Sequence, residues 1–547
     1  MTLVQSLRGA LLASLLLPAG LLLAQEPKVG TDYYEDKVDL GFKVKVPKGW
    51  TQIPPQPGDP NLVVRYSAAF NNYIKIGKGE NLGLGVFVIA FDKRKKGKEA
   101  TSTGSDDEFD LGSVGAKDTL DWIKTRLVQG KHWREVESED LKIKTVESAR
   151  SIVYEAQHED DEDALIRMFV AEYTLEPGLK IAFLGNGPGD RKWNKYESAY
   201  EKLAKSFERV EVETLAGGTS TDSNTPRGKK RAQLQLEVAK LSGWNLYETE
   251  NYFIVSDVTD KGFMDELMVR IEAIRDVYEE TYPPEQARAI LAEKKELEDK
   301  KRRDKKAEDD EPEDGEPDDE EPQEDRSISA LDPIEASRTS VLRVCSTEAM
   351  YHKYAPGSGG SAGYWNSAVQ ELVIYDDKQG GGRRDTWIVL NHEAFHQYIF
   401  YFYGALAPHS WYNEGTGDFY SGYEYKHKKF NLKENPWRKT TIQSAINTGK
   451  YVPLREFVTW TQLQYYGQND MGVERGICYA QGWSFIYFLR TGPTAKPRGW
   501  NKDWNDILDK YLRTLGTTGD LEAAVETAFA GVNWHELEDA WKRCIAP

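Results

Sequence analysis

Alternating apolar and charged residues mark the first third of the chain as strand-rich. Residues 42–46 place an apolar side chain at every second position, as a strand with one buried face requires, and a turn signal follows at 47–50. Two stretches, 118–128 and 195–207, instead repeat apolar residues at helical spacing. Further strands are predicted at 85–91, 151–157, 165–173 and 180–184. We therefore expect residues 31–212 to form one α+β domain.

A glycine-rich run at 185–189, GNGPG, interrupts this pattern. It resembles a phosphate-binding loop, but it contains a proline and lacks the Lys-Ser/Thr pair that follows such loops. Glycine, asparagine and proline together are typical of turns. We expect a turn at these residues and no phosphate site.

A change of composition at 213–230 separates two folded regions. Gly, Ser and Thr dominate this stretch without periodicity, which predicts a flexible linker. The second region, 231–547, opens with a short helix near Arg231, a strand at 252–258 and an amphipathic helix at 262–282. Its later elements are predicted strands at 340–345 and 371–375 and helices at 480–489, 504–515, 521–529 and 534–544.

The net charge of −18 is unevenly distributed along the chain. Residues 309–325 contain twelve acidic residues and no basic one, so twelve of the eighteen excess negative charges lie in one tract. Together with the Lys/Glu-rich residues before it, this tract forms a charged insertion at 287–327 that cannot bury a core, and we expect it to be disordered. A calcium-binding tail, or a tail for a basic partner, is the alternative. The remaining parts are only mildly acidic, and we expect no nucleic-acid partner.

The N-terminus has the layout of a cleavable export signal. Arg8 supplies a positive charge, residues 11–23 supply an apolar core, and Leu22-x-Ala24 supplies a small-residue cleavage site. We expect cleavage after Ala24 and a secreted or periplasmic protein. No stable membrane span is expected either, because no later segment reaches about 20 uninterrupted apolar residues.

Three cysteines, Cys345, Cys478 and Cys544, lie in the C-terminal half. In an oxidising compartment two of them could pair, and the sequence does not choose among the three pairings. Buried unpaired thiols are the alternative. None has the CxxC spacing of a zinc or redox site.

The stretch 387–420 carries the side chains with the clearest chemistry. A helix is predicted from Asp385 to Tyr403, and His392 and His396 lie four residues apart on it. Their side chains therefore project from one face, one turn apart, which is the spacing at which two imidazoles share a zinc ion. Glu393 points toward the same face and can take a proton from zinc-bound water rather than bind the ion itself.

Two histidines leave the ion short of a third protein ligand, and NEGTGD at 413–418 supplies a candidate. Glu414 follows a turn signal at 407–409 and opens a second helical segment that could pack against the first. Asp418 lies four residues later on the same face, where it can accept the remaining ring N–H of a zinc-binding histidine and fix its tautomer. The alternative is a buried helix and turn that bind no metal.

These motifs resemble those of the gluzincin metallopeptidases, the group that includes thermolysin and the aminopeptidase N type. HEAFH at 392–396, with seventeen residues before Glu414, matches their HExxH and downstream NE pattern. WYNEG at 411–415 is similar to the WLNEG of the aminopeptidase type. The overall likeness is to peptidase-MA-like secreted bacterial proteins and covers about residues 240–545.

The resemblance also implies a tyrosine or histidine that stabilises the oxyanion. Tyr479 in YAQG is similar to the Tyr-x-Lys-Gly of the aminopeptidase type and is the candidate, although a core role is the alternative. His409 is the other possible donor. The GxMEN segment that anchors a substrate amine in that type has no counterpart, since GYWN at 363–366 could form an edge strand along the cleft but lacks the glutamate. Amine recognition is therefore unsupported, and an endopeptidase is an open reading.

A second resemblance concerns the first region. Its early strand followed by PKGW at 47–50, and its closing helix ending in KSFE at 205–208, resemble PsbP-like domains. That likeness implies an antiparallel sheet with helices and a noncatalytic accessory role.

The sequence as a whole predicts an exported α+β multidomain zinc metallopeptidase that acts on a peptide or protein substrate. The expected Zn²⁺ ligands are His392, His396 and Glu414, with Glu393 as general base. Two alternatives stay open: a noncatalytic exported binding or scaffold protein with a structural or absent metal, and a zinc hydrolase of a nonpeptide bond.

Overall fold

The computed structural model describes residues 26–68, 73–94, 115–127, 129–213, 225–309, 332–355, 361–379, 382–404, 406–427 and 429–545. The predicted export signal lies outside these ranges, as does all but the first residue of the acidic tract. The chain divides into two compact units: unit 1 comprises 1–217 and 239–242, and unit 2 comprises 218–238 and 243–547. Both units combine helices with sheets, which confirms the α+β multidomain class.

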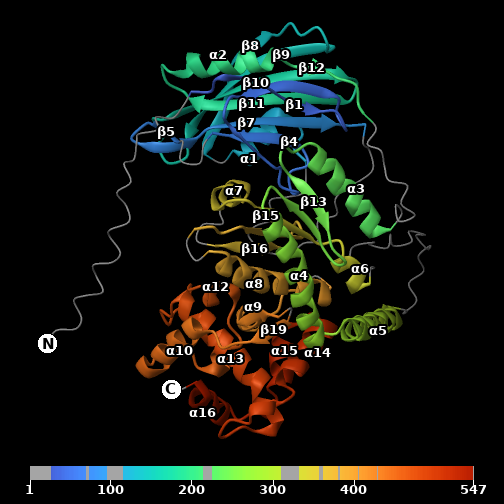
Figure 1. Ribbon diagram of the computed structural model, residues 1–547, viewed down its shortest axis with the longest axis vertical. Helices are drawn as coiled ribbons and strands as arrows, with labels where there is room; N and C mark the ends of the chain where they lie inside the picture. The colour runs from blue at the N-terminus through green and yellow to red at the C-terminus, as the bar shows by residue number, and fades with distance from the viewer. Residues whose placement is uncertain are drawn as a thin grey trace, which may run out of the picture. The chain divides into compact units, whose positions relative to one another are not determined.

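Unit 1 is built on a seven-stranded sheet in which every pairing is antiparallel (Figure 1). In spatial order its strands are β3 (Thr51–Ile53), β4 (Leu62–Ser67), β7 (Gly85–Asp92), β11 (Leu179–Pro188), β10 (Leu165–Glu176), β9 (Ser148–His158) and β8 (Gly130–Asp140). The other elements are β1 (Val29–Asp36), β2 (Phe42–Pro47), β5 (Tyr73–Ile76), β6 (Glu80–Gly83), β12 (Glu208–Arg209), α1 (Thr119–Arg126) and α2 (Trp193–Ala204). The strands and helices that the apolar patterns predict in this region are all present.

The predicted turn at 185–189 is wrong, because residues 185–188 belong to β11. A Cβ atom at Gly185 would lie 2.6 Å from Cδ1 of Tyr200 in α2, and one at Gly187 would lie 3.1 Å from the Tyr196 ring. The glycines therefore let two aromatic rings of α2 lie directly on the strand. A close approach between elements, and not a turn, is the physical reason for this composition.

Unit 2 is built on a five-stranded mixed sheet (Figure 1). In spatial order its strands are β13 (Asn245–Glu248), β14 (Phe253–Ser256), β15 (Val341–Cys345), β17 (Glu371–Tyr375) and β16 (Gly363–Asn366). The three central strands are parallel, and β13 and β16 run antiparallel to their neighbours at the two edges. The edge strand predicted at 363–366 is thus present as β16, and it packs against the helix that carries HEAFH.

Helices make up the remainder of unit 2, with one small hairpin, β18 (Tyr423–Lys426) and β19 (Lys429–Leu432). They are α3 (Pro226–Ala239), α4 (Lys261–Thr281), α5 (Pro284–Asp309), α6 (Pro333–Ser337), α7 (Glu348–Tyr354), α8 (Arg383–Phe402), α9 (Ser410–Ser421), α10 (Pro436–Thr448), α11 (Leu454–Phe457), α12 (Gln462–Tyr465), α13 (Arg475–Ala495), the 3₁₀ turn Lys502–Trp504, α14 (Ile507–Thr518), α15 (Leu521–Ala528) and α16 (Trp534–Ile545). The central helix α9 contacts both α8 and α13.

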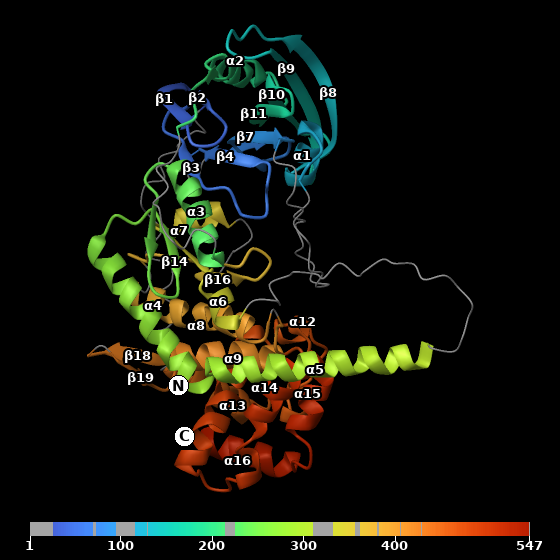
Figure 2. The same cartoon turned by 90° about the vertical axis from the view of Figure 1, so that its right-hand side faces the viewer.

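Two predicted irregular segments are partly helical. Helix α3 begins at Pro226, so the last residues of the predicted linker at 213–230 are helical, because a proline at the first position starts a helix well. Helix α5 continues to Asp309, so the Lys/Glu-rich half of the insertion at 287–327 is not disordered. Lysine, glutamate and alanine are strong helix formers even without a core to cover. Figure 2 shows the exposed end of α5 extending beyond the helices it packs against.

No helix within the described ranges is both long enough and apolar enough to cross a bilayer. The three cysteines are all free thiols, with Cys345 and Cys478 buried and Cys544 half-buried. The arrangement therefore matches the unpaired alternative for the cysteines.

Candidate metal centre

Helix α8 presents the HEAFH motif. It runs from Arg383 to Phe402, so it begins two residues before the predicted cap, and Gly404 follows it with a positive φ of 66°. Eleven of its residues are buried, so the helix is part of the core of unit 2. The rings of His392 and His396 lie 4.7 Å apart, centroid to centroid, on one face of the helix.

Helix α9 presents NEGTGD, and its glycines are required by close packing. A Cβ atom at Gly415 would lie 2.6 Å from the carbonyl oxygen of Gly482 in α13. One at Gly417 would lie 2.9 Å from the His392 ring. Helix propensity disfavours glycine at both positions, so the two glycines indicate that α9 must lie directly against α13 and the imidazole.

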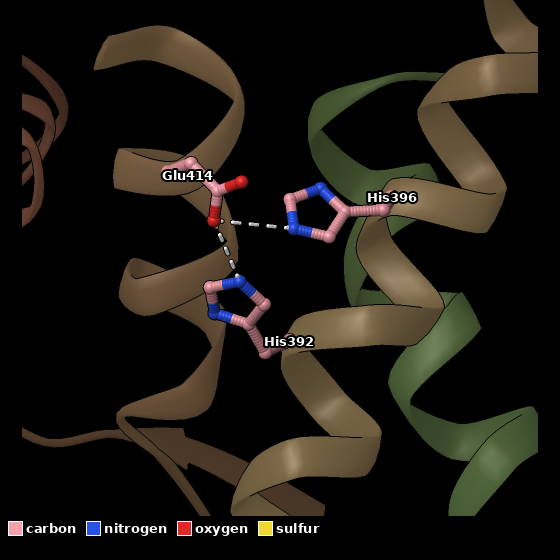
Figure 3. A group of neighbouring side chains, drawn as sticks. All are labelled: His392, His396 and Glu414. Atoms are coloured by element: carbon pink, nitrogen blue, oxygen red, sulfur yellow. Dashed lines mark hydrogen bonds and ion pairs between the residues drawn. The ribbon is translucent and has the colours of Figure 1, made fainter. Parts of the chain in front are cut away.

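Three donor atoms converge between these helices (Figure 3). Oε2 of Glu414 lies 3.1 Å from Nε2 of His392 and 3.5 Å from Nε2 of His396. Two ligands that are each about 2.1 Å from one tetrahedral zinc ion lie about 3.4 Å apart. Two imidazole nitrogens and a carboxylate oxygen are also a donor set that zinc prefers. The three residues therefore fit a zinc ion.

Each imidazole contacts a residue of α9 through its Nδ1 atom. Nδ1 of His392 lies 3.3 Å from Oδ1 of Asp418, and Nδ1 of His396 lies 3.0 Å from Oδ1 of Asn413. Because both oxygens accept, each ring carries a proton on Nδ1, and this orientation directs both Nε2 atoms at Glu414. Arg438 of α10 pairs in turn with Asp418, with Nε 2.7 Å from Oδ2. Asn413 and Arg438 were not identified from the sequence.

The charges of the centre favour a cation. Burial lowers the pKa of His392, but hydrogen bonds with Asp418 and Glu414 outweigh it and hold that pKa well above its usual range. Burial raises the pKa of Glu414, but the two imidazoles outweigh it and hold that pKa well below its usual range. The Glu414 carboxylate is thus ionised and favours positive charge beside it, which is the electrostatic condition for a metal site.

Glu393 is held by the edge strand. Its Oε2 accepts the backbone N–H of Trp365 in β16 at 3.0 Å. No other described residue forms a hydrogen bond or ion pair with this carboxylate, so Oε1 is available to a reacting water. The carboxylate lies close enough to His392 to raise the pKa of that residue, which places it beside the candidate metal ligands.

Two tyrosines lie near Glu414. The hydroxyl of Tyr466 donates to Oε1 of Glu414 at 2.7 Å. The ring of Tyr479 stacks on that of Tyr466, and Arg475 donates to its hydroxyl at 3.4 Å. Burial and the charge of Glu414 raise the pKa of both phenols, so both remain hydrogen-bond donors at neutral pH. The sequence analysis did not identify Tyr466, because this residue follows a short helix and has no fixed spacing from either motif.

His409 lies outside this group of residues. Both its backbone N–H and its Nδ1 contact the hydroxyl of Tyr511, each at 2.9 Å, at the start of α9. Burial lowers the pKa of His409 to about 4, so it is a neutral structural residue at physiological pH. Between the two proposed oxyanion donors, the arrangement therefore favours Tyr479.

A second group of potential ligands lies in unit 1 and is less suited to a metal. Glu80, His158 and Asp160 can bring their donor atoms within 4.8 Å of one another. However, Nδ1 of His158 accepts the backbone N–H of Asp160 at 3.1 Å. The neutral ring then carries its proton on Nε2 and has no free lone pair for an ion.

No family model matches the chain, and no curated protein does. Among solved structures, the chain is similar to cyanobacterial PsbP (CyanoP) from Synechocystis sp. PCC 6803, with 16% identity over 35% of this chain and 96% of that one and a TM-score of 0.22. It is also similar to the Ran-binding protein Mog1p from Saccharomyces cerevisiae, with 12% identity over 31% of this chain and 91% of that one and a TM-score of 0.18. Similarity at these TM-scores identifies no family, so the gluzincin and PsbP resemblances stay predictions from the sequence.

Proposed function

We propose that this protein is an exported zinc-dependent peptidase. The observation that carries the proposal is the convergence of Nε2 of His392, Nε2 of His396 and Oε2 of Glu414, with each imidazole oriented by a residue of α9. The contacts of both Nδ1 atoms with Asp418 and Asn413 leave both Nε2 atoms directed at one carboxylate oxygen, which is the orientation that a shared metal ion needs. The apolar leader at 1–24 supports export.

The residues around the centre supply the groups that amide hydrolysis needs. A bound Zn²⁺ ion would act as a Lewis acid toward water and the scissile carbonyl. Glu393 takes the proton of the attacking water on Oε1 and delivers it to the leaving amine, while the N–H of Trp365 fixes its other oxygen. Tyr479, kept protonated by its surroundings, donates a hydrogen bond to the developing oxyanion.

The ligand count supports a catalytic rather than a structural metal. Structural zinc sites take four protein ligands, whereas catalytic sites take three and leave the fourth position to water or substrate. Within the described residues, the group of histidine, cysteine and acidic side chains around this point has three members: His392, His396 and Glu414. This count favours the enzyme over a scaffold that uses zinc to hold its fold.

The neighbouring edge strand supports a peptide substrate. Among the described strands β16 is the last of its sheet, and no described strand pairs with its outer edge, which suits the addition of an extended chain. Trp365 connects that strand to Glu393 by a hydrogen bond. A peptide that extended β16 would therefore run past the general base, which favours a peptide over a nonpeptide bond. Unit 1, on its sequence resemblance, would serve as a noncatalytic accessory module.

Metal analysis of the purified full-length protein tests the proposal. We expect one equivalent of zinc in the wild type and loss of that zinc in His396→Gln. His535→Gln is the matched control, because His535 is 86% exposed and lies outside the metal ligands. Zinc retained in His396→Gln at the wild-type level would contradict the assignment of the ligands.

A further inference from the structure

A cavity of unit 2 lies on the side of α9 that faces away from the candidate metal ligands. Its volume is about 610 Å³, which is in the range of pockets that hold a small organic molecule. Tyr412 and Phe419 of α9 line it, whereas His392, His396 and Glu414 do not. The cavity is therefore separate from the candidate metal centre.

Arg490 of α13 lines this cavity and is a cation without an acidic partner. No described carboxylate lies within ion-pair distance of its guanidinium. One nitrogen, Nη2, donates to the hydroxyl of Tyr282, while the Nε–H is buried and has no hydrogen-bond partner. A guanidinium has five N–H donors, and Tyr282 is the one described residue that accepts a hydrogen bond from Arg490.

The surroundings of Arg490 compensate its charge only in part. The rings of Tyr282 and Phe419 lie 5.2 and 5.5 Å from the guanidinium carbon, which gives two cation–π contacts. The hydroxyls of Tyr282 and Tyr412 bond to each other at 3.0 Å and are neutral. Arg490 is half-buried, and neither aromatic rings nor neutral hydroxyls replace an anion beside its partly desolvated charge.

The rest of the lining combines apolar side chains with the neutral polar residues Thr281, Thr491, Thr494 and Asn505. Leu432, Leu489 and the tyrosine rings form its walls. Asp509, the acidic residue of the lining, is exposed and accepts a hydrogen bond from Gln286 at 2.9 Å, so it is not the counterion of Arg490. A ligand that fits must therefore combine an anionic group with an apolar body.

We propose that this cavity binds an organic carboxylate with an apolar or aromatic body, whose carboxylate pairs with the guanidinium of Arg490. Arginine and a carboxylate match in geometry, because two parallel N–H donors meet two acceptor oxygens. Either a free aromatic acid or the C-terminal residue of a peptide has this chemistry. The site does not depend on the proposed peptidase activity.

Calorimetric titration of the full-length protein with 4-phenylbutyrate tests the proposal. We expect saturable binding by the wild type and at least about tenfold weaker binding of 4-phenylbutanamide, which has the same shape without the charge. Arg490→Gln should weaken the acid by at least about tenfold as well. Arg513→Gln removes an exposed arginine elsewhere in unit 2 and should bind as the wild type does.

Three further measurements separate this cavity from the metal centre and identify the source of the carboxylate. His396→Gln should bind the acid normally, which separates this cavity from a carboxylate bound at the metal centre. An acetylated tripeptide ending in phenylalanine, with a free or an amidated C-terminus, distinguishes the peptide source from the free acid. If Arg490→Gln does not fold, the proposal is tested by comparing the affinities for 4-phenylbutyrate and 4-phenylbutanamide in the wild type and in His396→Gln. Equal affinity for acid and amide, or binding lost in His396→Gln and kept in Arg490→Gln, would overturn the proposal.

Discussion

Tyr466 donates its phenolic hydrogen to Oε1 of Glu414 at 2.7 Å. This hydrogen bond fixes the carboxylate so that the other oxygen, Oε2, faces both Nε2 atoms of His392 and His396. The proposed third ligand is therefore oriented by a residue that neither sequence motif contains. Partners of this kind set the geometry and the affinity of a metal site.

Tyr466→Phe should weaken zinc binding and leave the fold intact. The variant removes one hydroxyl and frees Glu414 to rotate, so we expect zinc affinity to fall about tenfold or more. A competitive titration with a zinc chelator measures this change. Tyr479→Phe is the matched control: it should retain zinc affinity and slow hydrolysis instead. Equal zinc affinity in wild type and Tyr466→Phe would show that the hydrogen bond does not orient the ligand.

Asp418→Asn should affect the metal through His392. The amide has the same size but loses the charge that orients His392 and pairs with Arg438. We expect zinc affinity to fall by about 10- to 100-fold. Asp470→Asn, at an exposed position, should change nothing in the same titration. A wild-type zinc affinity in Asp418→Asn would show that Asp418 does not orient His392 for the metal.

Acid should destabilise the protein in part through His409. Its pKa is lowered from 6.5 to about 4 by burial, so the folded state binds fewer protons than the unfolded state between those values. The stability that the neutral ring contributes is therefore present above about pH 6.5 and lost as the pH falls toward 4, by about 2 kcal/mol. Urea unfolding at pH 7 and pH 4.5 measures this loss. His409→Asn keeps a polar group without titrating, and its loss should be smaller than that of the wild type; equal losses would contradict the assignment.

Gly185→Ala should destabilise unit 1. The new methyl group would lie 2.6 Å from the ring of Tyr200, which is fully buried, so the strand or α2 must move. Overpacking of this kind costs about 1–3 kcal/mol. At Gly83, in β6 of the same unit, the closest ring atom would be 3.6 Å away, so Gly83→Ala should be nearly neutral. The unfolding midpoints of both variants in denaturant are compared with that of the wild type. An unchanged midpoint for Gly185→Ala would contradict the packing argument.

Much of the fold follows from periodicity, and its exceptions have physical causes. Alternation over 42–46 predicts β2, and the helical pattern at 195–207 predicts α2. The GNGPG run looks like a turn because the sequence does not distinguish a glycine that allows close packing from a glycine that allows a positive φ. The charged helix α5 looks disordered because helix propensity acts without any apolar pattern.

The candidate site divides in the same way. Ligands fixed by one helix, such as His392 and His396, follow from their spacing, because a helix brings residues four apart together. Tyr466 and Arg438 come from separate segments that only tertiary packing brings to Glu414 and Asp418. No local pattern encodes contacts between such distant residues.

The central claim, that Glu393 is the base of a zinc peptidase, is tested most directly by Glu393→Gln. Zinc content and cleavage of a complex peptide mixture, followed by mass spectrometry, are measured together for the wild type, Glu393→Gln and the control Glu348→Gln, whose side chain is 66% exposed on α7. All three proteins should contain one zinc, and only Glu393→Gln should lose cleavage. Cleavage by Glu393→Gln at the wild-type rate, or no cleavage by the zinc-loaded wild type, would contradict the account.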